Sequence, residues 1–261
     1  MNADRSQKLS GGTIVVKLGG STLGAHDTSL ADIAQLALGG RRVVVVHGGG
    51  ALTTEWMKHL GVATEFVEGL RKTTPESLDV AIAVLAGVIN KRLVGELSSL
   101  GVRALGIAGA DGGIVRSVLS ERGLGLVGEN PVCDRAPLEA LLAAGFVPLI
   151  APIGLSPDDQ LININADAVA GAVSVALDAE ALIMLTDTAG VLDAKGQQLQ
   201  RINEAEATAL QSAGVVAGGM LPKLTACRAA VAVGAVARIV DGRLAGAVPA
   251  ALQDEAGTLV E

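Results

Sequence analysis

The most constraining feature of the sequence is the stretch Val43–Gly50, which reads VVVVHGGG. Four consecutive β-branched residues predict a strand that is buried on both faces, as in the middle of a parallel sheet. Glycines follow directly, and residues 51–60 have the pattern of a helix. Glycines at a strand-to-helix junction let backbone N–H groups approach an anion at the positive end of the helix. The stretch therefore predicts either an anion site or simply a tight turn.

The composition excludes several classes of partner. Of 261 residues, 50% are hydrophobic and 18% charged, which indicates a globular chain with a large core. Aromatic residues make up 1% and the net charge is −7, so we expect no nucleic-acid partner. Cys133 and Cys227 have no metal-ligand spacing and favour a reducing compartment. Residues 1–12 lack the apolar core of a signal peptide, and no apolar run is long enough for a membrane span. We therefore expect a cytoplasmic location.

A second buried strand and two helices fix the fold class. Residues 13–20 read TIVVKLGG, with Lys17 near the carboxyl end, the edge at which open α/β sheets bind ligands. Lys17 beside glycines suits a phosphate, although its ammonium group could instead reach solvent from the end of the strand. Residues 27–38 have helical spacing and lead back to the strand at Val43. This β-α-β order implies a parallel sheet, and residues 74–98 predict one further long helix that begins at Pro75.

Polar residues in the second half occupy similar junctions. The segment Leu161–Asp167 reads LININAD and places Asp167 at the start of an alanine-rich helix, where a carboxylate either caps the helix or serves a site. The strand Ala181–Leu185 runs into the polar turn Thr186–Leu192. The segment Gly218–Lys223 reads GGMLPK and begins another helix. All these polar residues come at strand ends or helix starts.

Two lysines, Lys17 and Lys223, with an aspartate between them and glycine backbone nearby, suit in-line phosphoryl transfer. That chemistry needs positioning and charge neutralisation more than a covalent nucleophile. Asp167 could hold the two ammonium groups apart and direct them. The sequence has neither a Walker-type Gly-x-x-x-x-Gly-Lys nor a protein-kinase Gly-x-Gly-x-x-Gly, so a kinase of this sequence belongs to another class.

Six short segments in a fixed order carry a resemblance to a known family. They are Val16–Gly20, Val46–Gly50, Gly69–Arg71, Asn163–Asp167, Leu185–Leu192 and Gly218–Lys223. Over residues 13–258 the chain resembles the amino acid kinase family, and within it the members that phosphorylate N-acetyl-L-glutamate. The resemblance implies an α/β fold, a three-layer αβα sandwich around a central, mostly parallel open sheet, with two lobes. Residues 1–175 would bind the acceptor and form a homodimer, and residues 176–261 would bind ATP.

The implied reaction transfers the γ-phosphoryl group of ATP, bound with Mg²⁺, to the side-chain carboxylate of N-acetyl-L-glutamate. The product is an acyl phosphate in arginine biosynthesis. The metal would arrive with the nucleotide, so no protein metal site is expected. An acceptor carboxylate is already ionised near neutral pH and needs no general base, so we expect His47 to be structural.

The resemblance also assigns roles to individual residues. Lys17 and Lys223 would neutralise charge on the transferred group, and Asp167 would orient both. The expected acceptor site has backbone N–H groups that cradle oxygen atoms, an arginine on the α-carboxylate and an asparagine on the acetamido group: Gly49, Gly50, Arg71 and Asn163. The expected nucleotide site consists of Gly19, Gly20, Asp187, Thr188, Ala189, Gly190, Val191, Leu192, Val215, Val216, Ala217 and Met220.

Other functions remain open at this point. A sister kinase that acts on a carrier-protein-linked glutamate or aminoadipate would share these segments, but it would need a basic rim, and only Arg71-Lys72 is basic near the acceptor segment. A non-catalytic metabolite sensor would be expected to lack one of the three charged residues, and all three are present. A dinucleotide-dependent oxidoreductase would need Gly-x-Gly-x-x-Gly after the first strand, and Leu18-Gly19-Gly20-Ser21 does not supply it.

Overall fold

The computed structural model describes residues 11–19, 28–67 and 69–261. Its centre is a sheet with the strand order β12-β14-β13-β11-β1-β2-β8-β5. Neighbouring strands are parallel except that β14 runs antiparallel to β13. The strands are β1 (Thr13–Leu18), β2 (Arg42–His47), β5 (Ala104–Ala108), β8 (Val147–Ala151), β11 (Ala181–Thr186), β12 (Arg201–Ile202), β13 (Val236–Asp241) and β14 (Thr258–Val260).

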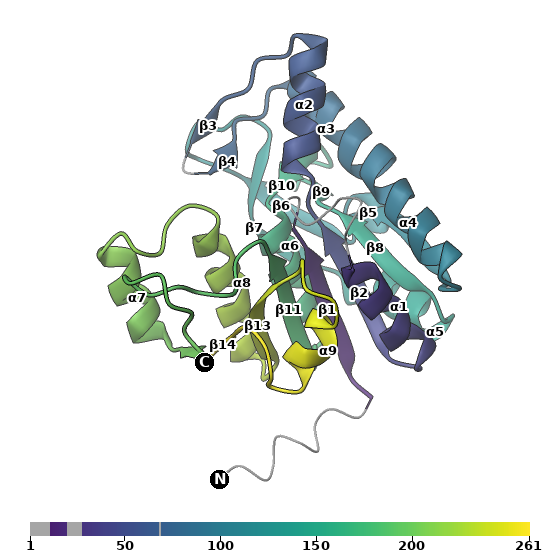
Figure 1. The fold of residues 1–261 in the computed structure, drawn as a ribbon. Helices are drawn as coiled ribbons and strands as arrows, with labels where there is room; N and C mark the ends of the chain where they lie inside the picture. Colours follow the sequence, from purple (N-terminus) through teal and green to yellow (C-terminus); the bar gives the residue numbers. More distant parts are fainter. Residues whose placement is uncertain (1–10, 20–27, 68) are drawn as a thin grey trace.

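Helices cover both faces of this sheet (Figure 1). On one face lie α1 (Ser29–Leu38), α4 (Asn90–Ser99) and α9 (Ala247–Leu252). On the other face lie α5 (Arg135–Ala143), α6 (Ala166–Ala176) and α8 (Met220–Ala232). The predicted three-layer α/β architecture with a mostly parallel sheet is thereby confirmed. The sheet runs continuously through both halves of the sequence, and the lobe boundary at residue 175 stays a prediction.

The alternation of side chains along β1 and β2 divides the core in two. Ile14 and Val16 pack with Val43 and Val45 under α1 and α4, whereas Val15 packs in the cluster on the face of α6. Because side chains alternate along a strand, Lys17 emerges on the same face as Val15. His47 emerges on the opposite face, with Val43 and Val45. The strand pattern therefore sends the two polar residues in different directions.

The remaining elements surround the carboxyl ends of the central strands (Figure 1). They are α2 (Gly50–Leu60), β3 (Phe66–Val67), β4 (Leu70–Arg71), α3 (Pro75–Ile82), the π-helix η1 (Ala83–Ile89) and the 3-10 turn η2 (Asp111–Gly113). The helix α7 (Glu204–Ser212) lies instead beside α8 (Figure 1). A small closed barrel contains β6 (Val115–Leu119), β7 (Val127–Cys133), β9 (Ile153–Leu155) and β10 (Leu161–Ile164). Across the described ranges, no helix has the length and apolar character needed to cross a bilayer.

The helix predicted over residues 74–98 has the expected extent, but it is not α-helical throughout. It begins at Pro75, where Thr74 and Ser77 form a capping box, and its last segment ends at Ser99. Between its two α-helical segments lies the π-helix η1. The π-helical segment packs against the glycines that follow β2, as described below.

Candidate active site

The two lysines meet on one buried carboxylate. Lys17 Nζ lies 2.9 Å from Asp167 Oδ1, and Lys223 Nζ lies 3.2 Å from Asp167 Oδ2. Lys223 also donates to the carbonyl of Gly219 at 3.1 Å. Asp167 is 4% exposed and Lys17 5%, so these ion pairs are shielded from water. The predicted triad of charged residues is therefore assembled, with the aspartate bridging two ammonium groups.

Local structure explains why Asp167 is available for the lysines. The N-cap of α6 is Asn165, whose Oδ1 accepts from Asp167 N at 2.8 Å and from Ala168 N at 3.2 Å. Since Asn165 satisfies the free N–H groups, the Asp167 side chain is not needed as the cap, which was one reading of the sequence. Asp167 lies in the first turn, where the positive end of the helix favours a carboxylate.

The electrostatics of this cluster depend on Asp167. Burial lowers the pKa of Lys17, and the nearby charge of Lys223 lowers it further, whereas the Asp167 carboxylate raises it. Asp187, at the carboxyl end of β11, also raises the pKa of Lys17. Without Asp167 the site would bring two ammonium groups together in a dry environment, which favours loss of a proton. Asp167 therefore holds both lysines in position and favours their charged state.

The predicted acceptor residues line one cavity of about 180 Å³. Gly49 and Gly50 come from the loop after β2, Arg71 from β4 and Asn163 from β10. Asn163 donates to Thr73 Oγ1 at 3.3 Å. The other residues that line the cavity are Gly48, Thr53, Phe66, Gly69, Leu70, Ala81, Leu85, Val127, Pro152, Ile164, Asn165 and Ala166. The fold thus joins residues from both halves of the sequence in a single small pocket.

Arg71 is held firmly at the wall of this cavity. Its Nη2 donates to Thr54 Oγ1 at 2.7 Å and to the Gly50 carbonyl at 3.2 Å, and Nη1 contacts Met57 Sδ at 3.3 Å. The guanidinium group stacks on the Phe66 ring, 4.6 Å from its centroid. Burial lowers the pKa of Arg71. A fixed, partly desolvated guanidinium group of this kind suits a bidentate contact with a carboxylate.

The predicted nucleotide residues follow the carboxyl ends of β1 and β11. Asp187 and Ala189 are exposed, and Thr188 donates to the Gly190 carbonyl at 3.1 Å. The side chains of Val191 and Val216 are buried in the core, so only their backbone could reach a nucleotide. Of the other predicted residues, Gly19 follows β1 and Leu192 belongs to the segment after β11. Val215 and Ala217 lie between α7 and α8, and Met220 begins α8. Gly20 lies outside the described residues.

The sequence reasoning missed three supporting residues. Thr54 anchors Arg71 and Phe66 stacks on it. Asn90 lies buried against His47, beneath residues Gly48–Gly50, here called the glycine loop. A detectable signal existed for Asn90, because a polar residue inside an otherwise apolar helical stretch calls for a buried partner. Thr54 and Phe66 gave no signal, since their contacts depend on how α2 and β3 fold against β4.

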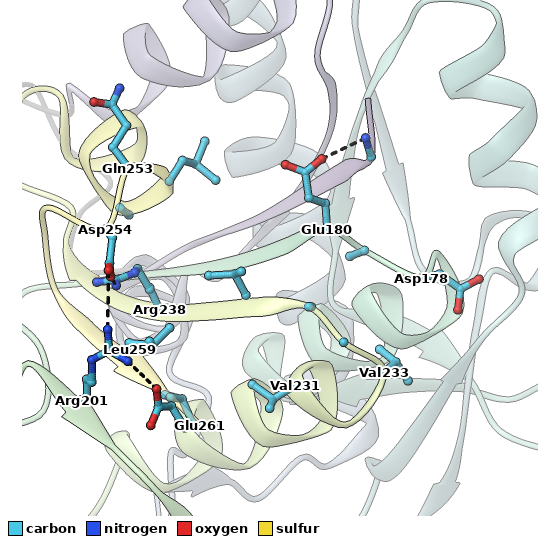
Figure 2. Close-up of a pocket in the computed structure, with 18 residues that line it drawn as sticks. Asp178, Glu180, Arg201, Val231, Val233, Arg238, Gln253, Asp254, Leu259 and Glu261 are labelled. Carbon is cyan, nitrogen blue, oxygen red and sulfur yellow. Dashed lines mark hydrogen bonds and ion pairs between the residues drawn. The ribbon is translucent and has the colours of Figure 1, made fainter. Parts of the chain in front are cut away.

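A second, larger cavity of about 760 Å³ lies at the amino ends of β1, β11 and β13 (Figure 2). Figure 2 shows Arg201 between Asp254 and Glu261, at 3.7 and 2.7 Å. Arg238 pairs with Asp254 and donates to the Ala256 carbonyl at 2.8 Å. Within the described part of the chain, none of the lysines or glycines of the candidate site lines this cavity, whose own glycines, Gly12 and Gly234, precede β1 and β13. The sheet therefore separates it from the Asp167 cluster.

Within the described part of the chain, no three His, Cys, Asp or Glu side chains form a group that could hold a metal ion. Both cysteines are free thiols, and burial raises the pKa of Cys133 to about 12.

Known proteins are similar to this chain over almost its whole length. A relative from Acidiphilium cryptum (strain JF-5), named acetylglutamate kinase, is 42% identical over 270 residues, covering 96% of this chain and 90% of that protein. Another acetylglutamate kinase, from Dehalococcoides mccartyi, is 39% identical over 243 residues, covering 91% and 89%. The solved structure of smu.665 from Streptococcus mutans UA159 has a TM-score of 0.82 at 28% identity, covering 95% of this chain and 98% of that one. Residues 12–241 match the amino acid kinase family, and the chain belongs to that family.

Proposed function

We propose that this protein transfers the γ-phosphoryl group of ATP to the side-chain carboxylate of N-acetyl-L-glutamate, a step of arginine biosynthesis. The observation that carries the proposal is the pairing of Lys17 and Lys223 on the buried Asp167. Close relatives over almost the whole chain, named acetylglutamate kinase, support the choice of acceptor.

The reaction needs no general base. An oxygen of the acceptor carboxylate, already ionised, forms a bond to the γ-phosphorus as the bond from that phosphorus to the β,γ-bridging oxygen breaks. ADP leaves with the bond electrons, and no proton moves. Charge on the transferred group falls between Lys17 and Lys223, which stabilise it electrostatically. Mg²⁺, bound to the nucleotide, would supply further charge neutralisation.

Acceptor recognition follows from the small cavity. Arg71 would bind the α-carboxylate with the guanidinium group that Thr54 and the Gly50 carbonyl hold in place. Asn163 would bond the acetamido group, and the N–H groups of Gly49 and Gly50 would face the reacting oxygens. A cavity of about 180 Å³ fits a small free metabolite better than a substrate on a carrier protein. This supports the free acetylated amino acid over the carrier-linked alternative.

The nucleotide would lie over the carboxyl ends of β1 and β11. Gly19 and Gly20 would contact its phosphates, and the segments 187–192 and 215–220 would hold the rest. On this view residues 1–175 form the acceptor lobe and residues 176–261 the nucleotide lobe. Two copies of the acceptor lobe would form a homodimer. The free Cys133 and Cys227 suit a cytoplasmic enzyme.

Substrate choice is tested by measuring ATP consumption with four acceptors side by side: N-acetylglutamate, glutamate, aspartate and N-acetylaminoadipate. We expect turnover with N-acetylglutamate and at most a few per cent of that rate with the others. Glutamate lacks the acetamido group, and the longer N-acetylaminoadipate would place its carboxylate beyond the lysines. Absence of turnover with N-acetylglutamate under all conditions would overturn the proposal and favour the non-catalytic sensor.

A further inference from the structure

A buried polar network lies directly beneath the glycine loop. His47 and Asn90 are both 0% exposed, and His47 Nε2 lies 3.0 Å from Asn90 Nδ2. His47 Nδ1 lies 3.0 Å from the carbonyl oxygen of Gly48, the first glycine of the loop. Burial lowers the pKa of His47 to about 4, so the ring is neutral at physiological pH. A neutral imidazole carries its proton on only one nitrogen, and the network decides which.

The surroundings of Asn90 fix the orientation of its amide. Its Nδ2 faces the carbonyls of Leu149 at 3.0 Å and Ile107 at 3.4 Å, which can only accept. Its Oδ1 accepts from Lys91 Nζ at 2.9 Å, and Lys91 is itself held by the Gly106 carbonyl at 2.8 Å. The NH₂ group therefore points toward His47, and Asn90 donates to Nε2. It follows that Nε2 is the unprotonated nitrogen of the ring.

The remaining proton must therefore lie on Nδ1, from which it is donated to the Gly48 carbonyl. Gly48 N in turn donates to the Leu18 carbonyl at 3.0 Å, so the first glycine is fixed on both sides. Gly49 is fixed by packing, because a Cβ at this position would lie 2.1 Å from Ile89 Cδ1 and 2.8 Å from Leu85 Cδ2 of the π-helix. Gly49 and Gly50 begin α2, where backbone N–H groups have no intrahelical acceptor.

We propose that His47 is a positioning residue whose Nδ1–H, set by Asn90, holds the Gly48 carbonyl and directs the N–H groups of Gly49 and Gly50 at the transferred phosphoryl group. The inference rests on the proposed function, because it assigns the loop to the phosphoryl group. A purely structural His47 would tolerate the loss of its Nδ1–H donor as long as the core stayed filled. The positioning role requires the Nδ1–H form.

The tautomer is measured directly, without activity, by long-range ¹H–¹⁵N correlation on the full-length protein near pH 7. The signals of His47 are assigned by their loss in the His47→Asn variant. We expect a protonated Nδ1 and an unprotonated Nε2, the opposite of the form that dominates in free histidine. A protonated Nε2 would overturn the proposal even if the protein proves to be an active kinase.

Two substitutions then test the roles of the two ring nitrogens separately. His47→Asn keeps an N–H donor near the position of Nδ1, whereas His47→Gln places its amide near the position of Nε2 and leaves the Gly48 carbonyl without a donor. We expect kcat with N-acetylglutamate to fall at least about ten-fold further in His47→Gln than in His47→Asn. The KM for N-acetylglutamate should change less than three-fold in both, since the loop acts on the reacting group.

Thermal unfolding of both variants provides the control for packing. If the loss of kcat in each variant parallels its loss of unfolding temperature, His47 is only structural and the proposal is wrong. The same conclusion follows if both variants lose kcat equally. The wild-type protein is assayed in parallel, because its failure to turn over N-acetylglutamate would instead contradict the proposed function. The tautomer measurement remains valid in that case.

Discussion

At the scale of single residues, the site combines charged groups whose burial is tolerated only because of their partners. Lys17 and Asp167 are almost fully buried, and each offsets the cost of removing the other from water. Buried His47 is instead neutral, since burial lowers its pKa to about 4. Lys17 and Asp167 could be identified as candidate site residues from the sequence, because they lie at a strand end and at a helix start. The partners of Arg71 could not, because they come from contacts between α2, β3 and β4.

The lowered pKa of His47 predicts how stability depends on pH. Between pH 6.5 and 4 the unfolded chain binds a proton that the folded chain excludes. The contribution of neutral His47 to the free energy of unfolding is therefore fully present above pH 6.5. About 3 kcal/mol of this contribution is lost as the pH falls to 4. Urea unfolding from pH 7 to 4 should show a shallower decline in His47→Asn than in the wild type. Identical pH dependence would contradict a neutral, buried His47.

The anchoring of Arg71 by Thr54 predicts a selective effect on the acceptor. Thr54→Val removes the hydroxyl 2.7 Å from Arg71 Nη2, and a hydrogen bond to a charged group contributes about 2 kcal/mol. We expect the KM for N-acetylglutamate to rise about ten-fold, with kcat and the KM for ATP nearly unchanged. Thr54→Ser keeps the hydroxyl and should restore most of the affinity. Equal effects on both substrates would argue against this role.

At the scale of elements, strands and their junctions with helices could be predicted where runs of apolar residues are followed by glycines. The β-branched runs of β1 and β2 and the apolar run of β11 identified the central strands, and glycines marked the carboxyl ends of β1 and β2. The π-helix η1 was missed because its sequence, AVLAGVI, has ordinary helical character and its hydrogen bonding is decided by packing. The barrel of β6, β7, β9 and β10 was missed because it depends on pairing between distant segments.

The N-cap of α6, Asn165, supports both the stability of this helix and the position of Asp167. Asn165→Ala should lower the free energy of unfolding by about 1 kcal/mol, because two backbone N–H groups lose their acceptor. It should also lower kcat several-fold, since Asp167 lies in the freed turn. Asn203→Ala removes the equivalent cap of α7 and is the matched control. Urea unfolding and steady-state kinetics should show similar destabilisation in both variants but lower kcat only in Asn165→Ala.

At the scale of the whole molecule, the strand order creates the site. Placing β11 and β2 on either side of β1 brings segments from both ends of the sequence to one edge of the sheet. Lys17 then meets Asp167 from α6 and Lys223 from α8, which pack on the same face. Sequence could suggest that these residues share an edge. Only the fold could place both lysines on the two oxygens of one carboxylate.

The most direct test of that claim is the turnover of Lys223→Ala with ATP and N-acetylglutamate. Lys195→Ala, which removes an exposed lysine elsewhere in the second half, is the control. Loss of a group that stabilises the transition state typically costs about 100-fold to 1,000-fold in kcat. We expect a loss of that size in Lys223→Ala, with an unfolding temperature close to that of the wild type and with Lys195→Ala fully active. Near-normal turnover by a folded Lys223→Ala variant would contradict the role of the paired lysines.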